Sequence, residues 1–137
     1  MALTHLLDTS VIGRLGTPVV REVLDPLALA GRLGRAGITD LEVGYGSRNS
    51  REWDQDMADL AVFQLVETTA DHVRRARQVQ RMLASRSQRG RKVPDLLIAA
   101  AAEQRRLTLL HYDSDFDLIA RVTGQACQWI VAAGSID

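Results

Sequence analysis

The stretch LTLLHYDSDFD, residues 107–117, contains the pattern that decides the fold of this chain. Its apolar part, residues 107–112, has the length and composition of a strand, and the Asp, Ser and Asp that follow at 113–115 are typical of a turn. Residues 116–122 then repeat apolar side chains at helical spacing. The order is therefore strand, turn and helix, with carboxylates at the point where the strand ends.

The same order recurs on both sides of this stretch. Residues 3–7 form a short apolar run that ends at Asp8, after which Thr9 and Ser10 can cap a short helix. Further strands are predicted at 61–66 and 127–132, and helices at 19–35 with a kink or restart at Pro26, at 39–45, from 52 to the next strand, at 73–83 and at 96–103. Alternating strands and helices predict an α/β domain with a parallel sheet and right-handed crossovers.

Length and composition indicate one globular domain over residues 1–137. With 46% hydrophobic and 25% charged residues, the chain is large enough to fold without disulfides. The single cysteine, Cys127, has neither a bridge partner nor metal-ligand spacing, so we expect a small buried thiol and a reducing, cytoplasmic setting. No apolar run approaches the roughly 20 residues of a membrane-spanning helix, which argues against an integral membrane protein and predicts a soluble one.

The charges are balanced overall but unevenly distributed. The chain has 17 Lys and Arg and 17 Asp and Glu, so the net charge favours no class of partner. Residues 72–94 contain eight Lys or Arg and no acid, whereas residues 52–71 contain six Asp or Glu and no Lys or Arg. The basic segment is suited to phosphate groups, but also to a solvated helix face or to pairing with the acidic segment. Charge alone leaves these alternatives open.

Four acidic residues, Asp8, Glu42, Asp95 and Asp113, each lie where a strand-like or helix-opening segment meets a loop. If these segments pack as one parallel sheet, their ends converge and the carboxylates share a pocket at the same edge. Such a cluster repels itself unless a cation lies within it, and Mg²⁺ or Mn²⁺ suits carboxylate oxygens. Divalent ions supply what phosphodiester cleavage needs, an activated water and stabilisation of charge on the phosphoryl and leaving oxygens.

Each acid also has a purely structural interpretation. Asp8 can cap the helix after the first strand, and Glu42 can be the third residue of a capping box that begins at Thr39. Asp95, next to Pro94, can stabilise the positive end of its helix, and Asp113, Asp115 and Asp117 can be turn and cap residues. The joint pattern favours a shared site, because every one of these acids falls on the same side of its element.

Four motifs occur in a characteristic order along the chain. They are Leu-Asp-Thr-Ser at 7–10, the segment 39–42 with glycines shortly after it, Pro-Asp-Leu-Leu-Ile-Ala-Ala at 94–100, and His-Tyr-Asp-Ser-Asp-Phe at 111–116. In this order and at this chain length they resemble a PIN-domain ribonuclease, and more narrowly the VapC toxins of bacterial toxin–antitoxin pairs. The resemblance covers essentially the whole chain, and the segment around Asp95 together with Asp-x-Asp-Phe is its most specific part.

The resemblance implies a Rossmann-like PIN domain with a central parallel sheet and helices on both sides. It also implies that the acids bind one or two Mg²⁺ or Mn²⁺ ions for cleavage of structured RNA such as tRNA. Many relatives have a hydroxyl residue two positions before the fourth acid, where this chain has His111. Carried onto this chain, the metal-binding and catalytic acids are Asp8, Glu42, Asp95 and Asp113, with Asp115 as a fifth acid and Thr9 and Ser10 as supporting hydroxyls.

Partners also follow from the resemblance, which implies a cognate VapB-like antitoxin, homodimers and toxin–antitoxin hetero-oligomers. The apolar residues of 19–33 are suited to an antitoxin segment, or equally to the core or a homodimer face. The three histidines, His5, His72 and His111, form no obvious catalytic pair and are predicted to be structural. We expect a basic group just before the helix of Asp95 to hold RNA phosphates, and it consists of Arg86, Arg89, Arg91 and Lys92.

Two other functions are compatible with the same acids. A metal-dependent phosphohydrolase acting on small phosphoesters would use them too, but the chain lacks an Asp-x-Asp after the first strand and a Gly-rich phosphate loop. An inactive binding module of the same fold would be expected to have lost acids, and none of the four is missing. The sequence therefore favours the nuclease.

Overall fold

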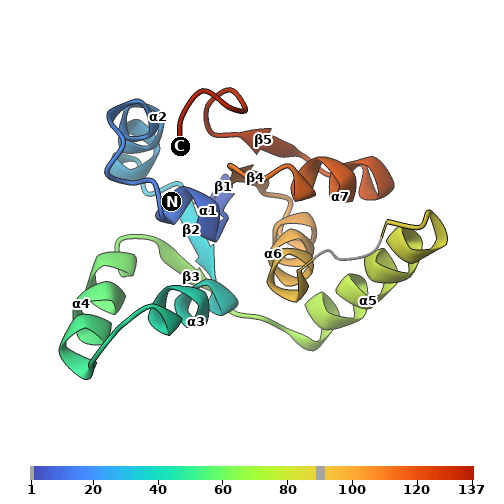
Figure 1. The fold of residues 1–137 in the computed structure, drawn as a ribbon, viewed down its shortest axis with the longest axis horizontal. Coiled ribbons are helices and arrows are strands. Elements are labelled where there is room, and N and C mark those ends of the chain that lie inside the picture. Colours follow the sequence, from blue (N-terminus) through green and yellow to red (C-terminus); the bar gives the residue numbers. More distant parts are fainter. Residues whose placement is uncertain (1, 89–91) are drawn as a thin grey trace.

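A five-stranded, all-parallel sheet forms the centre of the protein (Figure 1). The computed structural model describes residues 2–88 and 92–137. The strand order is β3-β2-β1-β4-β5, so the order reverses on the two sides of β1. The strands are β1 (His5–Leu7), β2 (Leu33–Ala36), β3 (Gln64–Val66), β4 (Thr108–His111) and β5 (Cys127–Trp129).

Helices cover both faces of this sheet, which confirms the predicted α/β architecture. Leu6 of β1 packs with the buried residues of the last three helices, whereas Leu7 packs with those of the first two and the fourth. This alternation is expected, because successive side chains of a strand point to opposite faces. The helices are α1 (Thr9–Ile12), α2 (Pro18–Leu29), α3 (Gly37–Tyr45), α4 (Ser50–Leu60), α5 (Ala70–Ser85), α6 (Val93–Gln104) and α7 (Asp115–Thr123).

The prediction of a helix through residue 35 was wrong. Helix α2 ends at Leu29 with Pro26 inside it, and the chain continues into β2 between β1 and β3. In β2, a Cβ atom on Gly34 would lie 2.8 Å from the Leu3 side chain and 3.2 Å from the Gln64 carbonyl oxygen. Glycine therefore allows the neighbouring strands to approach, a tertiary requirement that helical periodicity does not reveal.

The first residues of α5 and α3 differ in how each helix begins. Thr69 caps α5, since its hydroxyl accepts the His72 N–H while the His72 ring accepts the Thr69 N–H. The capping box at Thr39 was wrong, because α3 begins two residues earlier and Thr39 is fully buried inside it. The Thr39 hydroxyl is thereby available for contacts with another helix.

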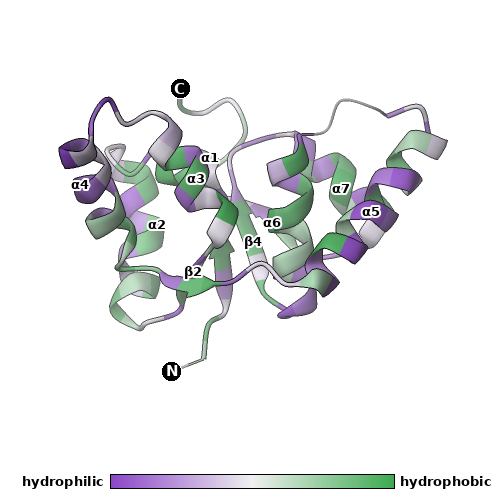
Figure 2. Ribbon diagram, turned by 90° about the horizontal axis from the view of Figure 1, so that it is seen from below, coloured by the Kyte–Doolittle hydropathy of each residue, from purple (hydrophilic) through white to green (hydrophobic). Residues whose placement is uncertain are grey.

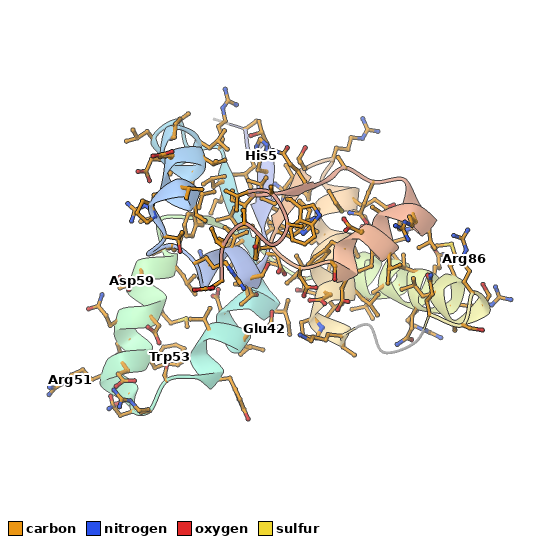
Figure 3. All side chains as sticks on the ribbon, turned by 45° about the horizontal axis from the view of Figure 1, so that its top comes forward. His5, Glu42, Arg51, Trp53, Asp59 and Arg86 are labelled. Atoms are coloured by element: carbon orange, nitrogen blue, oxygen red, sulfur yellow. The ribbon has the colours of Figure 1, made fainter. Side chains whose placement is uncertain are left out.

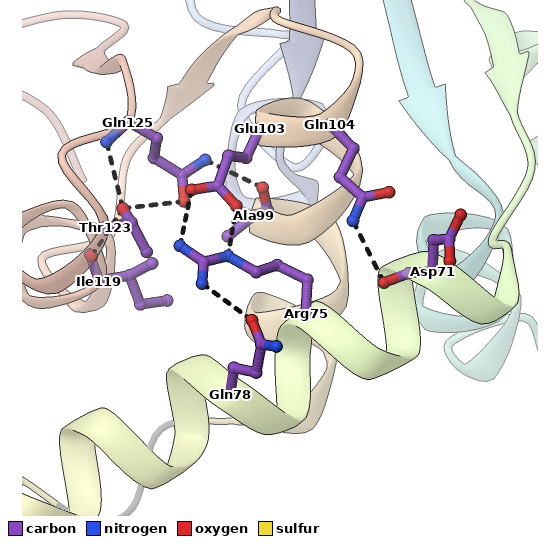
Figure 4. Close-up of polar contacts among 9 residues, drawn as sticks. All are labelled: Asp71, Arg75, Gln78, Ala99, Glu103, Gln104, Ile119, Thr123 and Gln125. Atoms are coloured by element: carbon purple, nitrogen blue, oxygen red, sulfur yellow. Dashed lines mark hydrogen bonds and ion pairs between the residues drawn. The ribbon is translucent and has the colours of Figure 1, made fainter.

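Helix α6 lies between β4 and α5, and most of its length is hydrophobic (Figure 2). Ile98 and the four alanines of 99–102 are buried, and such small side chains allow close packing on both sides. Arg75 of α5 joins the pair by an ion pair to Glu103 of 2.6 Å, and the Gln104 side chain donates to the Asp71 carbonyl (Figure 4). Helix α5 is thus held on α6 by polar contacts as well as by its buried stripe.

Two remaining predictions concern Cys127 and the membrane. Cys127 is partly buried in β5, and burial raises the pKa of its thiol to about 12, so the thiol stays protonated. Within the described ranges 2–88 and 92–137, no helix combines the length and the apolar character that crossing a membrane requires.

Candidate metal centre

The predicted acids meet at the carboxyl edge of the sheet. Asp8 directly follows β1, Asp113 comes two residues after the end of β4, and these two strands are neighbours at the place where the strand order reverses. In open parallel sheets, ligands bind in the crevice at such a point. Asp95 lies in the first turn of α6 and Asp115 is the first residue of α7, so both helices begin at this edge.

Three of the carboxylates are close enough to share one ion. One ligand oxygen from each of Asp95, Asp113 and Asp115 lies within 4.8 Å of the others. Asp8 is coupled to this group electrostatically, because its charge is the largest of those that raise the pKa of Asp95. Glu42 in turn acts on Asp8 and lies outside the three-acid group among the described residues.

The surroundings of the two most buried acids disfavour the ionised form of their carboxyl groups. Asp8 is 3% exposed and Asp95 is 5% exposed. Burial, followed by the charges of Asp8, Asp113 and Asp115, raises the pKa of Asp95 to about 7, although Lys92 opposes the shift. Burial also raises the pKa of Asp8, against the hydrogen bonds that it accepts from Ser10. A positive charge at this edge would relieve both carboxylates.

The donor set fits a hard divalent cation. Asp8 Oδ1 and Asp95 Oδ2 are buried and have no hydrogen-bond partner within the described part of the chain. Unpartnered buried carboxylate oxygens are costly, and they are rare unless an ion or water uses them. Carboxylate oxygens alone, without sulfur or imidazole, suit Mg²⁺ or Mn²⁺ better than zinc or copper.

The two hydroxyls beside Asp8 connect the elements that carry the acids. Thr9 Oγ1 lies 2.7 Å from Glu42 Oε1 and 3.0 Å from Thr39 Oγ1. A hydroxyl has one hydrogen and a carboxylate only accepts, so Thr9 donates to Glu42, and the Thr39 hydroxyl is left to donate to Thr9. Ser10 Oγ accepts the N–H of Tyr112 at 2.9 Å, which ties α1 to the end of β4. These bonds position Asp8 and Glu42 relative to each other.

Asp8 caps helix α1 and is also a candidate metal ligand. Its Oδ2 accepts the Ser10 N–H at 2.9 Å, so Asp8, rather than Thr9 or Ser10, caps α1. Its other oxygen, Oδ1, is the atom without a partner among the described residues. Capping therefore uses one oxygen of the Asp8 carboxylate and leaves the other available to a cation.

His111 supports the loop that carries Asp113. The ring is fully buried, with centroids 5.1 Å from Phe116 and 5.0 Å from Trp129. Its Nδ1 accepts the Asp113 N–H at 3.2 Å, and burial lowers the pKa of the imidazole, so the neutral ring carries its proton on Nε2. Asp117 accepts the Trp129 indole N–H at 3.1 Å, which gives that acid a structural contact outside the cluster.

The predicted basic group is only partly described. Lys92 immediately precedes α6, is exposed, and lowers the pKa of Asp95, so it lies within electrostatic reach of the acids. Arg86 is exposed just beyond the end of α5. Arg89 and Arg91 lie outside the described residues. Contact of this group with RNA stays a prediction.

The sequence did not predict that Thr39 is hydrogen-bonded to Thr9, the residue that also contacts Glu42. The spacing from Thr39 to Glu42 suggested a local cap, whereas the structure uses Thr39 in a contact with a residue 30 positions earlier. No local pattern marks this pairing, because it depends on how α1 packs against α3 (Figure 3 labels Glu42 on α3).

Comparisons with known proteins agree with this architecture. Residues 5–122 match the family model described as PIN domain. The chain is 64% identical over 137 residues to Ribonuclease VapC51 of Mycobacterium tuberculosis, with 100% of both chains covered. A VapBC structure from Salmonella typhimurium, bound to DNA, has a TM-score of 0.76 at 20% identity, covering 94% of this chain and 99% of that one. VapBC-5 from Mycobacterium tuberculosis, described as a member of the VapBC family of toxin-antitoxin systems, has a TM-score of 0.61 at 26% identity, covering 96% and 98%.

Proposed function

The chain belongs to the PIN domain family and to its VapC group, and from this membership we propose that it is a metal-dependent endoribonuclease. It acts as the toxin of a toxin–antitoxin pair and cleaves structured RNA such as tRNA. The observation that carries the proposal is the acidic cluster, in which two buried carboxylate oxygens have no partner among the described residues. The 64% identical relative is named a ribonuclease, which supports the same reaction class.

In this proposal Asp8, Asp95, Asp113 and Asp115 hold Mg²⁺ or Mn²⁺, and Glu42 completes the acidic edge. When bound, the ion supplies a water of lowered pKa and positive charge against the phosphoryl oxygens. Thr9 keeps Glu42 in a fixed orientation through its hydrogen bond of 2.7 Å. Glu42 and Asp8 both lie outside the three-acid group, and with one ion held by the four aspartates Glu42 is the carboxylate that remains to accept a proton.

The backbone around the cluster also favours an anionic substrate. Helices α6 and α7 both begin at this edge, and the N–H groups of a helix N-terminus carry partial positive charge. These groups are suited to phosphate oxygens once the carboxylates are neutralised. The same edge without a cation repels phosphate, so substrate binding and metal loading are coupled.

We further propose a VapB-like antitoxin as partner, with homodimers, toxin–antitoxin hetero-oligomers and a cytoplasmic location. The support is the likeness to VapBC-5, whose description places it in a toxin–antitoxin family, at 26% identity over nearly the whole chain. Several large apolar side chains of the described residues are exposed and suited to protein contacts, including Leu29, Leu41 and Tyr45.

The test is cleavage of total cellular RNA by the purified protein, freed of any co-purifying partner, with and without Mg²⁺ or Mn²⁺. Asp95→Asn serves as the site variant. Asp54→Asn, an exposed position on α4, serves as the matched control. Discrete fragments that need the metal, disappear with Asp95→Asn and persist with Asp54→Asn are expected.

Three other outcomes would contradict the ribonuclease proposal. Equal cleavage by Asp95→Asn would indicate a contaminating nuclease. Hydrolysis of a small chromogenic phosphate ester without any RNA cleavage would indicate a phosphohydrolase. No activity with either substrate under any metal would indicate a binding module.

A further inference from the structure

Helix α5 carries a row of arginines on its exposed side, away from its buried core residues. Its buried side includes Ala76, Val79 and Leu83, which belong to the core. Arg74, Arg77 and Arg81 are all exposed, at positions i, i+3 and i+7 of the same helix. Side chains three and four residues apart lie about 5–6 Å from each other on one helix face, so these three guanidinium groups form one row.

The structure separates these arginines from those that have a structural partner. Arg75 is paired with Glu103 of α6 (Figure 4). Arg74 makes an ion pair with Asp71, but both side chains are 65% exposed and such a pair contributes little. Arg77 and Arg81 make no ion pair or hydrogen bond within residues 2–88 and 92–137.

The acidic segment does not neutralise this row. Helix α4, which carries Glu52, Asp54, Asp56 and Asp59, lies at the opposite end of the molecule from α5 (Figures 1 and 2). Like charges on one helix face are mildly unfavourable in themselves. The pairing of the basic and acidic segments, one of the alternatives left open by the sequence, is therefore absent from the described structure apart from Asp71.

The row lines a hollow on the outer surface of α5. The hollow has a volume of about 660 Å³ and is lined by Arg74, Arg77, Gln78, Gln80, Arg81 and Ala84. Arg77 and Gln80 also line a smaller groove of about 190 Å³ between α5 and α6, whose other wall includes Val93 and Leu97. Val93 begins α6 two residues before Asp95. The surface is thus continuous from the arginine row to the turn that carries Asp95.

We propose that the outer face of α5, through Arg77 and Arg81 with Arg74, binds the phosphate backbone of the RNA and directs it to the acidic edge. This inference rests on the proposed ribonuclease function and adds a substrate-binding surface to it. A row of guanidinium groups pairs with successive phosphates, and the amides of Gln78 and Gln80 can hydrogen-bond phosphate and sugar oxygens. The contact reads no base, so it serves RNAs of different sequence.

The test is the salt dependence of RNA binding by Arg77→Gln/Arg81→Gln. The probe is fluorescently labelled, unfractionated tRNA, titrated by anisotropy without divalent ions, and every protein also carries Asp95→Asn so that the RNA stays intact. Loss of two phosphate contacts should reduce the slope of log K against log salt by about 1.4–1.8 and weaken binding roughly tenfold or more near 0.1 M salt. Thermal melts of each variant check that the fold is kept.

The matched control is Arg21→Gln/Arg51→Gln, which removes the same charge from α2 and α4. Both residues are exposed, and Figure 3 places Arg51 at the opposite end of the molecule from Arg86, the residue that follows α5. The control should keep the affinity and slope of the parent. An equal loss in the control would show that only net charge matters and would overturn the proposal.

Two further outcomes separate this proposal from the ribonuclease function. If the protein with Asp95 intact cleaves RNA but Arg77→Gln/Arg81→Gln binds tRNA like its parent, the inference fails and the function stands. If the double variant instead loses antitoxin binding while tRNA binding is kept, the face belongs to a protein partner and the inference also fails. Absence of both binding and cleavage would overturn the two together.

Discussion

Replacing Asp95 with Asn is expected to stabilise the metal-free protein at neutral and alkaline pH. Asp95 is 5% exposed, and its pKa is raised from 3.8 to about 7 by burial and by three neighbouring carboxylates. Between these two values the folded state binds more protons than the unfolded state, so the free energy of unfolding falls as pH rises. The cost is absent below about pH 4 and complete above about pH 7.

The magnitude follows from the size of the shift. A difference of about 3 pKa units corresponds to about 4 kcal/mol at roughly 1.4 kcal/mol per unit, as an upper bound for this one group. Asparagine has nearly the same shape and cannot ionise, so this cost is missing from the variant. The stability of Asp95→Asn relative to the wild type should therefore rise steadily between about pH 4 and pH 7.

The assay is urea unfolding at several pH values from 4 to 8 in the presence of a chelator, followed by circular dichroism. Asp54→Asn, whose carboxylate is exposed on α4, is the control and should show no such trend. Mg²⁺ at about 100 times its dissociation constant should stabilise the wild type by about 2.7 kcal/mol and Asp95→Asn by less. If Asp95→Asn differs from the wild type by the same amount at every pH, the electrostatic interpretation of the cluster is wrong.

Three further predictions concern single contacts. Thr9→Val keeps the side-chain volume but removes the hydrogen bond to Glu42, so RNA cleavage should fall at least tenfold, with a loss of only about 1–2 kcal/mol in the free energy of unfolding. Unchanged cleavage would mean that this bond does not position Glu42. Phe116→Ala should lower the free energy of unfolding by about 3–5 kcal/mol, because its fully buried ring leaves a cavity, and a loss below 1 kcal/mol in urea unfolding would contradict the packing. Glu103→Gln weakens the ion pair to Arg75, in which both side chains are about a quarter exposed. The free energy of unfolding should fall by about 1 kcal/mol at low salt and by less at high salt, and a loss independent of salt would argue against an electrostatic contribution.

The fold class and the positions of the acids could be predicted from the sequence because both depend on local patterns. Strands and helices alternate with clear apolar periodicity, and Asp8, Asp95 and Asp113 fall at element boundaries that the composition marks. Parallel connections then leave little freedom, since right-handed crossovers bring the carboxyl ends of the strands to one edge. The meeting of these acids follows from topology more than from any detail of packing.

The sequence by itself determined that strands and helices alternate, the edge on which the acids lie and the basic character of α5. Only the tertiary structure decided that residues 33–36 form a strand, that Thr39 bridges to Thr9, and that Arg75 is paired while Arg77 and Arg81 face outward. The physical reason is distance along the chain. Helical and strand periodicity is set by neighbours a few residues apart, whereas a bond such as that between Tyr112 and Ser10 joins positions 102 residues apart and exists only once the sheet and its helices have packed.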